Sequence, residues 1–380
     1  MVSILFCIGS KLDAQNILVP NYLSFEPELN YSGTIPSPKQ FLGYELGEAF
    51  TLYAHVVDYF EKIDELSDKI VVKNYGKTYE DRPLMYAIIT SSANHQRLEE
   101  IRQNNLKLSD PLSTPLVEAQ ALMKNQPLVV SYSYNIHGNE ASSTEAAMQV
   151  AYRLIAANDP ATQKLLDDVV FVMYPCINPD GRDRYVAWYK SMQRMMPGKE
   201  PYDLDHHDPW PNGRTNHYWF DLNRDWVWGV HPESRGHTAV YQQWMPQLHT
   251  DYHEMGYNNN YFTVPGTTPR NFLLPDRYEP LADTIGRANA NAFNRHQISY
   301  YTREDYDFYP SYGSSYPSVM ARLGCWWSKA VYLEDELSKQ TMARFLLCVS
   351  AFLTITSPRL LPYKKGQSAK PFFSNTPMMR

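Results

Sequence analysis

A histidine and a glutamate stand three residues apart in the stretch "NIHGNEASSTEAAMQV", at His137 and Glu140. A neutral imidazole and a carboxylate are both good zinc ligands, and this spacing lets both side chains reach one ion from a tight turn. Gly138 between them permits unusual backbone angles. An ordinary alternative is a helix start, with Asn135 or Asn139 as the cap and Glu140 in the first turn. The short pattern alone leaves both interpretations open.

Three further polar segments follow downstream. "INPDGRDRY" ends an apolar run, and Asn-Pro-Asp-Gly is by itself a strong turn sequence. "FDLNRDW" contains Asn223 and Arg224; an arginine presents a planar fork that suits a carboxylate, although a surface salt bridge is the ordinary interpretation. "LHTDYHEMG" carries His249 and His253, which alternate with Asp251 along an expected strand and therefore share a face with it. Taken singly, each segment is more often structural than functional.

Hydrophobic periodicity indicates the elements that must position these residues. Apolar spacing near 3.6 predicts helices within residues 47–68, 140–157 and 278–297, and a polar surface helix is expected over 95–108. β-rich runs predict a strand pair within 70–91 and strands within 126–136, 167–181 and 245–256. Alternating strands and helices predict an α/β fold with a mixed or mostly parallel central sheet flanked by helices. The polar segments then lie beyond the carboxyl ends of strands, where such sheets place ligand sites.

Composition narrows the classes of function. The chain has 380 residues, of which 43% are hydrophobic and 20% charged, so it can bury a sizeable core. A formal net charge of −6 without a long basic run argues against nucleic-acid binding. No apolar run reaches the length of about 18 residues that predicts a membrane span. The four cysteines are scattered without a CxxC pair, which argues against a thiolate zinc site or a disulfide framework.

Residues 1–40 are expected to form an N-terminal lead-in. The start, "MVSILFCIGSKLDAQ", has a short apolar stretch and a small-residue site near Ala14, but it lacks a basic beginning. A degenerate or truncated export signal and an ordinary N-terminal segment both stay open as interpretations. We expect a secreted or periplasmic location, with a cytoplasmic one left open.

The order and spacing of the polar segments together resemble the zinc carboxypeptidase family (M14 metallopeptidases). "HGNE", "NPDGR" and "LNRDW" carry the resemblance as a set, and it runs from about Gly43 to Pro317. The resemblance implies one zinc ion per chain, held by His137, Glu140 and His253, with an open fourth position for water.

Among the other histidines, His249 is the rival third ligand. "DYHEMG" places His253 directly before a loop, as the family's third histidine stands, so His253 is preferred over His249. His206 and His207 lie in a loop rich in Pro, Gly and Asp, where solvent-facing or cleft-lining positions are expected.

The resemblance also assigns substrate-binding residues. Asn223 and Arg224 match the pair that grips the C-terminal carboxylate of the substrate, which makes a member of the family an exopeptidase. The family's mobile tyrosine falls within "YDFYPSYGSSYP", at Tyr312 or Tyr316.

Two catalytic groups complete the expected site. The family's oxyanion-stabilising arginine falls after "NPDG", where we assign Arg194, with Arg182 and Arg184 as alternatives. The family's general base is a glutamate at the end of a late apolar strand. Its expected position falls near residues 327 and 328, which are not acidic, whereas Glu334 and Glu336 come several residues later.

We therefore hypothesise a frameshift near residue 319. Because Met and Trp have single codons, reading residues 319–329 with a shift of two nucleotides permits an apolar strand that ends in glutamate. The expected organisation is a lead-in over 1–40, a catalytic domain over 41–318 and a C-terminal part over 319–380 that is out of frame relative to the family. The resemblance leaves the C-terminal strands of the expected fold open.

The resemblance predicts a zinc-dependent metallocarboxypeptidase that hydrolyses C-terminal peptide bonds. Its expected partner is a peptide or protein C-terminus, with neither nucleic acid nor a transmembrane anchor involved. Two alternatives remain: a related zinc amidohydrolase or deacylase, and a zinc-binding homologue that is impaired in catalysis because it lacks the general base.

Overall fold

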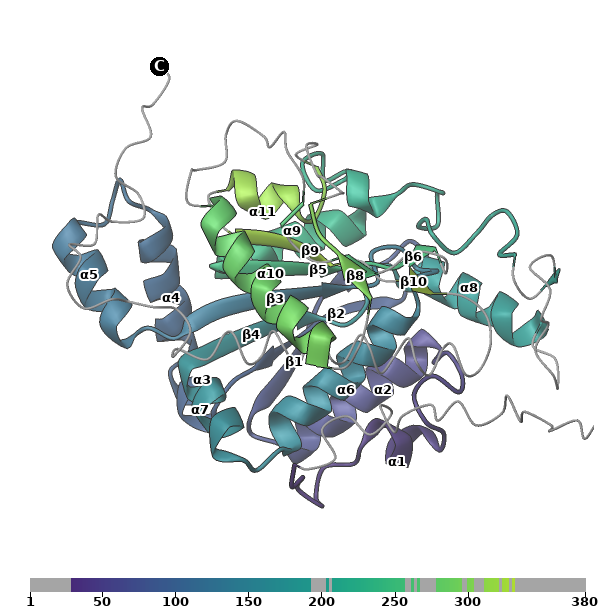
Figure 1. Cartoon of the computed structure of the whole chain (residues 1–380), viewed down its shortest axis with the longest axis horizontal. Coiled ribbons are helices and arrows are strands. Elements are labelled where there is room, and N and C mark those ends of the chain that lie inside the picture. Colours follow the sequence, from purple (N-terminus) through teal and green to yellow (C-terminus); the bar gives the residue numbers. More distant parts are fainter. Residues whose placement is uncertain are drawn as a thin grey trace, which may run out of the picture.

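A mixed β-sheet with helices on both faces forms the centre of the chain (Figure 1). The computed structural model describes residues 29–192, 203–204, 207–256, 261–262, 265–266, 278–295, 299–303, 311–320, 323–327 and 330–331. Within these ranges the sheet has six strands in the order β1-β2-β4-β3-β5-β9. The architecture confirms the predicted α/β fold.

The strands divide into an antiparallel edge and a parallel centre. β1 (Ile70–Lys77) pairs antiparallel with β2 (Pro83–Ile89), which is antiparallel to β4 (Val169–Tyr174). β4, β3 (Leu128–Tyr134), β5 (Leu248–Tyr252) and β9 (Leu323–Trp327) are parallel to one another. Two small sheets lie outside this one, formed by β6 (Met255–Gly256) with β10 (Ala330–Val331) and by β7 (Tyr261–Phe262) with β8 (Tyr300–Tyr301).

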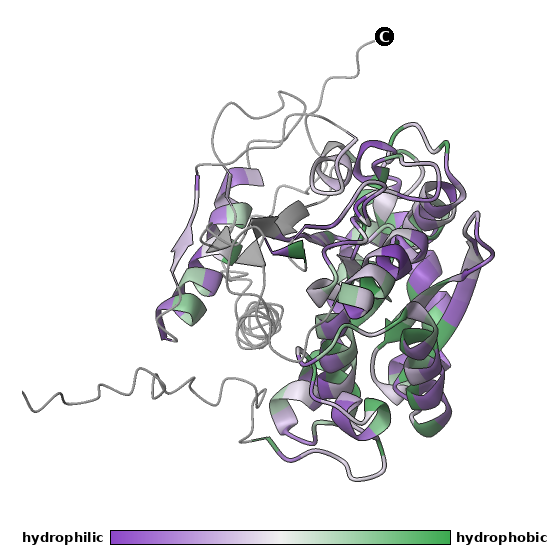
Figure 2. Cartoon of the chain, turned by 90° about the vertical axis from the view of Figure 1, so that its right-hand side faces the viewer, coloured by the Kyte–Doolittle hydropathy of each residue, from purple (hydrophilic) through white to green (hydrophobic). Residues whose placement is uncertain are grey.

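The sheet is covered by one set of helices on each face. Side chains of α2 (Tyr53–Leu66), α6 (Ser142–Ala156) and α10 (Tyr278–Arg295) pack on one face, and those of α4 (Leu98–Ser109) and α9 (Pro232–Trp244) pack on the other. Neighbouring strand residues alternate between the two cores, since Val130 joins the first cluster and Val129 the second. Figure 2 shows hydrophobic stretches on the strands and on the adjoining helices.

Further helices complete the described part of the chain. They are α1 (Pro38–Leu42), α3 (Ser92–Gln96), α5 (Leu116–Asn125), α7 (Pro160–Asp168), α8 (Pro179–Met192), the 3-10 helix η3 (Leu222–Arg224) and α11 (Ser315–Val319). None of the helices in the described ranges combines the length and apolar character that spanning a membrane requires.

The "NPDG" segment opens a helix rather than a free turn. Asn178 accepts a hydrogen bond at its side-chain oxygen from the amide of Gly181, and its carbonyl accepts one from Arg182. Pro179 occupies the first position of α8, where its missing N–H costs nothing. The turn signal in the sequence is therefore the first turn of α8, and Asn178 caps it.

The predicted strands and the main helices are present. The structure ends α2, β3, β5 and α6 a few residues inside the predicted limits, because capping and turn residues occupy the margins. β9 begins after residue 319 and joins the same sheet. The domain boundaries at residues 40 and 318 stay predictions.

Candidate metal centre

The candidate metal ligands lie where two adjacent parallel strands end. β3 and β5 are paired so that Tyr134 lies opposite Tyr252. His137 and Glu140 follow the end of β3, and His253 directly follows the end of β5. The carboxyl ends of neighbouring parallel strands meet at one edge of a sheet, so the two segments are brought together there.

Three donor groups converge at this edge. His137 Nδ1 lies 2.7 Å from Glu140 Oε1, and His253 Nδ1 lies 3.2 Å from Glu140 Oε2. The two Nδ1 atoms are 3.2 Å apart. All three side chains are buried, and one ligand atom from each lies within 4.8 Å of the others. The structure therefore brings together the three residues that were predicted as metal ligands.

The outer nitrogen of each histidine faces a carboxylate. His137 Nε2 lies 3.0 Å from Asp221 Oδ1, and His253 Nε2 lies 2.7 Å from Asp251 Oδ2. A carboxylate on the outer nitrogen fixes the tautomer and the ring orientation, which leaves Nδ1 free to face a metal ion. Neither carboxylate was assigned a role from the sequence. Asp251 and His253 are two residues apart and share a strand face, and this spacing could have indicated from the sequence that Asp251 contacts His253.

Electrostatic interactions within the centre are strong. Burial alone would raise the pKa of Glu140, but His137 and His253 hold the pKa well below its ordinary value. Burial would likewise lower the pKa of His253, yet Asp251 and Glu140 raise the pKa to about 10. The pKa of Asp221 is lowered against the effect of burial by its hydrogen bond to His137 and by the charges of Arg214 and Arg224. The carboxylates thus create a buried negative potential that attracts a cation.

The donor set fits a zinc ion. Two imidazole nitrogens and one carboxylate oxygen form the three-ligand combination that leaves a catalytic zinc one open position. Two Nδ1 atoms at 3.2 Å compete for a single proton, and a divalent cation bound by both would remove that conflict.

Asn135 holds the turn that carries the first two ligands. Its backbone has φ of 58°, and its side-chain amide donates to the carbonyls of His137, Gly138 and Glu140. Asparagine adopts this left-handed conformation more readily than most residues. The alternative interpretation named Asn135 or Asn139 as a helix cap, but α6 begins after Ala141, and the Asn135 amide spans the turn before it.

Gly138 lies against a second backbone segment. A Cβ atom at this position would lie 2.2 Å from the amide nitrogen of Arg182 and 2.5 Å from the carbonyl oxygen of Gly213. The amide of Gly138 also donates to the carbonyl of Arg214 at 3.3 Å. The glycine therefore lets the ligand turn pack directly on α8 and on the segment around residue 213.

The predicted carboxylate clamp lies beside the third ligand. Asn223 Nδ2 is 3.3 Å from His253 Nε2, and its side-chain oxygen accepts a hydrogen bond from Gly313 at 2.8 Å. The Arg224 guanidinium lies 4.3 Å from the centre of the Tyr312 ring. Its side chain is 40% exposed, so it can meet a ligand that enters from solvent. Asn223, Arg224 and Tyr312 thus form one group next to the metal ligands.

Tyr316 is half-buried against the core, and His249 lies within it. The Tyr316 ring packs against Trp226 and Tyr241. His249 is fully buried and bonds to Ser131 through Nδ1, and burial lowers its pKa to about 4. The structure leaves His249 outside the group of three side chains that could hold a metal ion. His207 is exposed, and His206 lies outside the described residues.

A different arginine from those assigned reaches the centre. Arg214 Nη1 lies 3.6 Å from Glu140 Oε1, and Arg214 Nη2 lies 3.0 Å from Asp221 Oδ2. The fully buried Arg182 is paired with Glu145, and Arg184 donates to backbone carbonyls of residues 212, 215 and 216. Both alternatives are therefore structural.

The first choice, Arg194, lies outside the described residues. Arg214 also follows "NPDG", where the resemblance places the family's arginine. Sequence order alone did not distinguish Arg214 from the arginines that were considered.

The position of the general base falls largely outside the described residues. β9 ends at Trp327, which lies opposite Tyr252 and hence one residue before His253 in register. Glu334 and Glu336 follow β9 and are not among the described residues. Their assignment stays a prediction.

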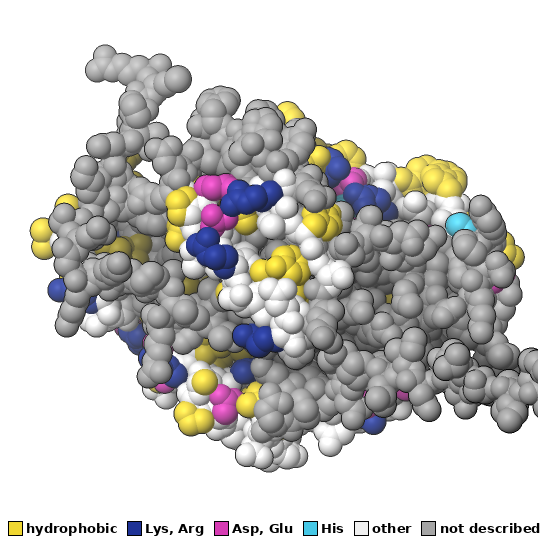
Figure 3. All heavy atoms as spheres, in the orientation of Figure 1, with side chains coloured by type: hydrophobic (Ala, Val, Ile, Leu, Met, Phe, Trp, Pro, Cys, Tyr) yellow, Lys and Arg dark blue, Asp and Glu magenta, His cyan; other side chains and the backbone are white. Residues whose placement is uncertain are grey.

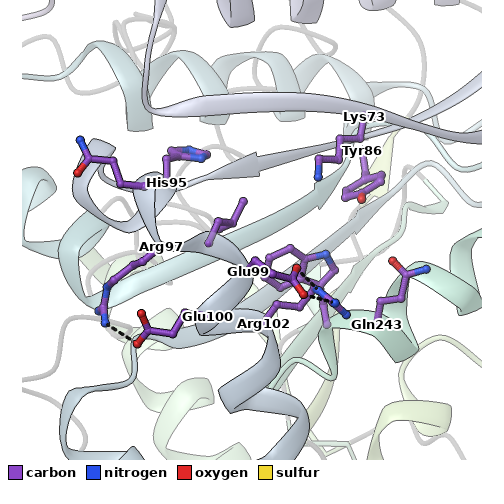
Figure 4. Close-up of a pocket in the computed structure, with 11 residues that line it drawn as sticks. Lys73, Tyr86, His95, Arg97, Glu99, Glu100, Arg102 and Gln243 are labelled. Atoms are coloured by element: carbon purple, nitrogen blue, oxygen red, sulfur yellow. Dashed lines mark hydrogen bonds and ion pairs between the residues drawn. The ribbon is translucent and has the colours of Figure 1, made fainter.

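A cavity of about 770 Å³ lies away from this centre, between α3, α4 and the outer face of β1 and β2 (Figure 4). Its charged lining is mostly paired, with Arg102 bonded to Glu99 and Arg97 near Glu100. No predicted site residue lines it. This cavity is therefore separate from the candidate metal centre.

Comparisons with known proteins complete the description. A family model described as zinc carboxypeptidase matches residues 56–355. A comparison with curated protein sequences gave no match. The solved structure of carboxypeptidase A from Helicoverpa armigera is similar with a TM-score of 0.52 and 17% identity, covering 82% of this chain and 76% of that chain.

Two further solved structures share the fold. A metallo-carboxypeptidase from Pseudomonas aeruginosa has a TM-score of 0.51 and 14% identity, covering 80% of this chain and 68% of that chain. Thrombin activatable fibrinolysis inhibitor has a TM-score of 0.55 and 14% identity, covering 89% of this chain and 80% of that chain. At these identities the solved structures show the common fold alone.

Proposed function

Because the chain belongs to the zinc carboxypeptidase family, we propose that it is a zinc-dependent metallocarboxypeptidase that hydrolyses the C-terminal bond of peptides. The convergence of His137, Glu140 and His253 supports this most directly. When bound there, one zinc ion would polarise the scissile carbonyl and lower the pKa of water. The substrate is a peptide or protein C-terminus, and we propose a secreted or periplasmic location.

The remaining side chains of the centre have distinct tasks in this proposal. Arg224 and Asn223 bind the terminal carboxylate of the substrate by charge-assisted hydrogen bonds. Arg214 donates to the oxygen that becomes negatively charged as the carbonyl is attacked. Tyr312 stacks on Arg224 and holds its guanidinium in place. Asp221 and Asp251 orient the two ligand histidines.

A second candidate is a zinc-binding homologue with impaired catalysis. The observation that favours it is the absence of an acidic residue from 319–329, where the resemblance expects the base. Losing a positioned general base lowers a rate by about 10²–10⁴-fold. The frameshift hypothesis gives one cause, and the coding DNA around residue 319 decides it: codons that do not yield the shifted peptide rule it out.

The experiment that tests the proposal compares peptides with free and amidated C-termini, with and without a chelator. A zinc carboxypeptidase releases the terminal residue of the free acid, and both the chelator and amidation abolish this. Equal turnover of free and amidated peptides would contradict the carboxypeptidase and favour an amidohydrolase or deacylase. Zinc binding without any turnover would identify the impaired homologue.

A further inference from the structure

Exposed aromatic side chains gather in the segment that precedes the carboxylate clamp. Trp210 is 73% exposed, Tyr218 62% and Trp219 56%, and Phe220 and Tyr79 are also exposed. We call Tyr79, Trp210, Tyr218, Trp219 and Phe220 the aromatic rim. Figure 3 shows hydrophobic side chains at the upper right of the molecule, where Figure 1 draws the connection between α8 and α9. Large exposed apolar surfaces are uncommon on a soluble protein unless they bind something.

Two pairs of neighbouring rings form most of the rim. The ring centres of Trp210 and Trp219 are 4.7 Å apart, and those of Tyr79 and Tyr218 are 4.6 Å apart. Consecutive residues 218–220 join the two pairs along the chain. Aromatic side chains arranged this way offer a wide contact area with few rotatable bonds, which lowers the entropy cost of binding a ligand.

Buried groups hold the backbone of the rim. The side-chain oxygen of Asn216, which is fully buried, accepts hydrogen bonds from the amides of Tyr218 and Phe220. Arg184 of α8 donates to the carbonyls of Asn212, Thr215 and Asn216. The rim therefore stands on a fixed loop, in the conformation that would meet a ligand.

The loop under the rim is anchored to the metal centre. The carbonyl of Arg214 accepts hydrogen bonds from Gly138 in the ligand turn and from the Asn178 side chain. Phe220 directly precedes Asp221, whose carboxylate bonds to His137. The rim thus borders the candidate active site on the side of Arg214.

The charged groups beside the rim are paired with one another. Glu80 bonds to His217 at 3.0 Å and to Arg82, which also bonds to Asp183. A surface that shows aromatic rings and internally paired charges suits an apolar ligand better than a charged one.

We propose that the aromatic rim binds the substrate chain upstream of the scissile bond and selects peptides with aromatic or large apolar residues there. This inference rests on the proposed function. If Asn223 and Arg224 bind the C-terminal carboxylate of a peptide, the surface outside this clamp contacts the residues of the peptide that come before its last one. The rim strengthens the binding of longer peptides, so it lowers KM and leaves kcat largely unchanged.

The test uses two blocked pentapeptides that share the last two residues. One carries Phe, Leu and Trp at the three upstream positions, and the other carries Ser and Asn. The zinc-loaded protein is expected to favour the aromatic peptide about tenfold in kcat/KM, and Trp219→Ala or Trp210→Ala should bring this ratio close to one. Leu112→Ala, an equally exposed apolar position near α5, is the control and should keep the ratio.

Calorimetric binding of the same peptides with amidated C-termini separates this inference from the proposed function. Binding of the aromatic peptide that weakens in both Trp variants supports the rim, even if no peptide is hydrolysed and the proposed function fails. Hydrolysis without any preference between the two peptides overturns the rim proposal alone. A rim-dependent dimer in sedimentation, without peptide preference, would also overturn it, because a second copy would then be the occupant.

Discussion

Every ring nitrogen of His137 and His253 faces a carboxylate oxygen. The inner nitrogens face Glu140, and the outer ones face Asp221 and Asp251. The outer carboxylates fix the orientation of both rings, so that each Nδ1 is directed toward Glu140 and toward the Nδ1 of the other histidine. At the scale of single residues, the two outer aspartates therefore set how well the centre can bind zinc.

Substitution Asp251→Asn should lower zinc affinity about 10–100-fold, because the amide holds the imidazole tautomer less firmly than the carboxylate does. Competition with a chromophoric chelator measures this. Asp58→Asn on α2, whose side chain is 58% exposed, is the matched control and should leave the affinity unchanged. Equal affinities of Asp251→Asn and the wild type would show that Asp251 does not position His253.

At this scale the sequence predicted the three candidate ligands but not the charged side chains that contact them. His137, Glu140 and His253 could be chosen because their types and order resemble a known family. Arg214 and Asp221 could not be assigned to Glu140 and His137 by spacing, because a loop folds back over the ligand turn to bring them there. Only the three-dimensional contact reveals that loop.

At the scale of elements, the ligand turn after β3 depends on close backbone packing. Asn135 spans the turn, and Gly138 lies directly against α8 and the residue 213 segment. The turn, and not the preceding strand, determines whether His137 and Glu140 point to the same place.

Substitution Gly138→Ala should destabilise the protein by about 3 kcal/mol, because a Cβ there overlaps the backbone of Arg182 and Gly213. Chemical denaturation of the metal-free protein measures the change. Gly33→Ala is the matched control: no atom lies within 4 Å of its Cβ position, so a change within about 0.5 kcal/mol is expected. Similar stabilities of the two variants would refute the close packing of the turn.

Glu233 in the first turn of α9 gives a prediction on pH. Burial raises the pKa of Glu233 to about 7 from an ordinary value of 4.5. The unfolded chain loses this proton first as pH rises, so the stability that the protonated form gives below pH 4.5 is lost between pH 4.5 and 7. Above pH 7 Glu233 is ionised in both the folded and the unfolded chain, so the free energy that its burial costs no longer changes with pH.

Glu233→Gln removes this cost and should stabilise the protein at pH 8 by about 3 kcal/mol relative to wild type, with little effect near pH 4.5. Urea denaturation at the two pH values measures the difference. Glu118→Gln, in the exposed first turn of α5, is the control and should show the same small effect at both pH values. A Glu233→Gln effect that does not change with pH would contradict the raised pKa.

The elements themselves were partly predictable from the sequence. β4 is a fully buried apolar run, β3 begins with one, and α6 has a clear apolar periodicity, so their types were correctly predicted. β5 is buried but carries His249, Thr250 and Asp251, and its strand was a less regular prediction. α8 was not predicted, because Asn178, Pro179 and Gly181 read as a turn. Its first turn is decided by tertiary contacts, such as the bonds of Arg182 to Thr51 and Glu145.

At the scale of the whole molecule, one sheet edge gathers residues that are far apart in the sequence. The β3–β5 pairing joins His137 to His253, and the loop between α8 and α9 adds Arg214, Asp221 and Asn223. Hydrophobic periodicity does not reveal the order of the strands. In a sheet that is mostly parallel, however, the carboxyl ends of the strands lie at one edge, and this predicts that the segments that follow those strands meet there. The identity of the general base depends on residues beyond β9, and it stays a prediction.

The zinc content of the purified protein is the most direct test of the account, because each proposed task depends on the metal centre. Elemental analysis should find about one zinc per chain in the wild type and in His55→Ala, whose side chain is 59% exposed on α2. His137→Ala and His253→Ala should each lose most of that zinc while remaining folded by circular dichroism. Undiminished zinc in both folded variants would contradict the central claim that His137, Glu140 and His253 hold the metal.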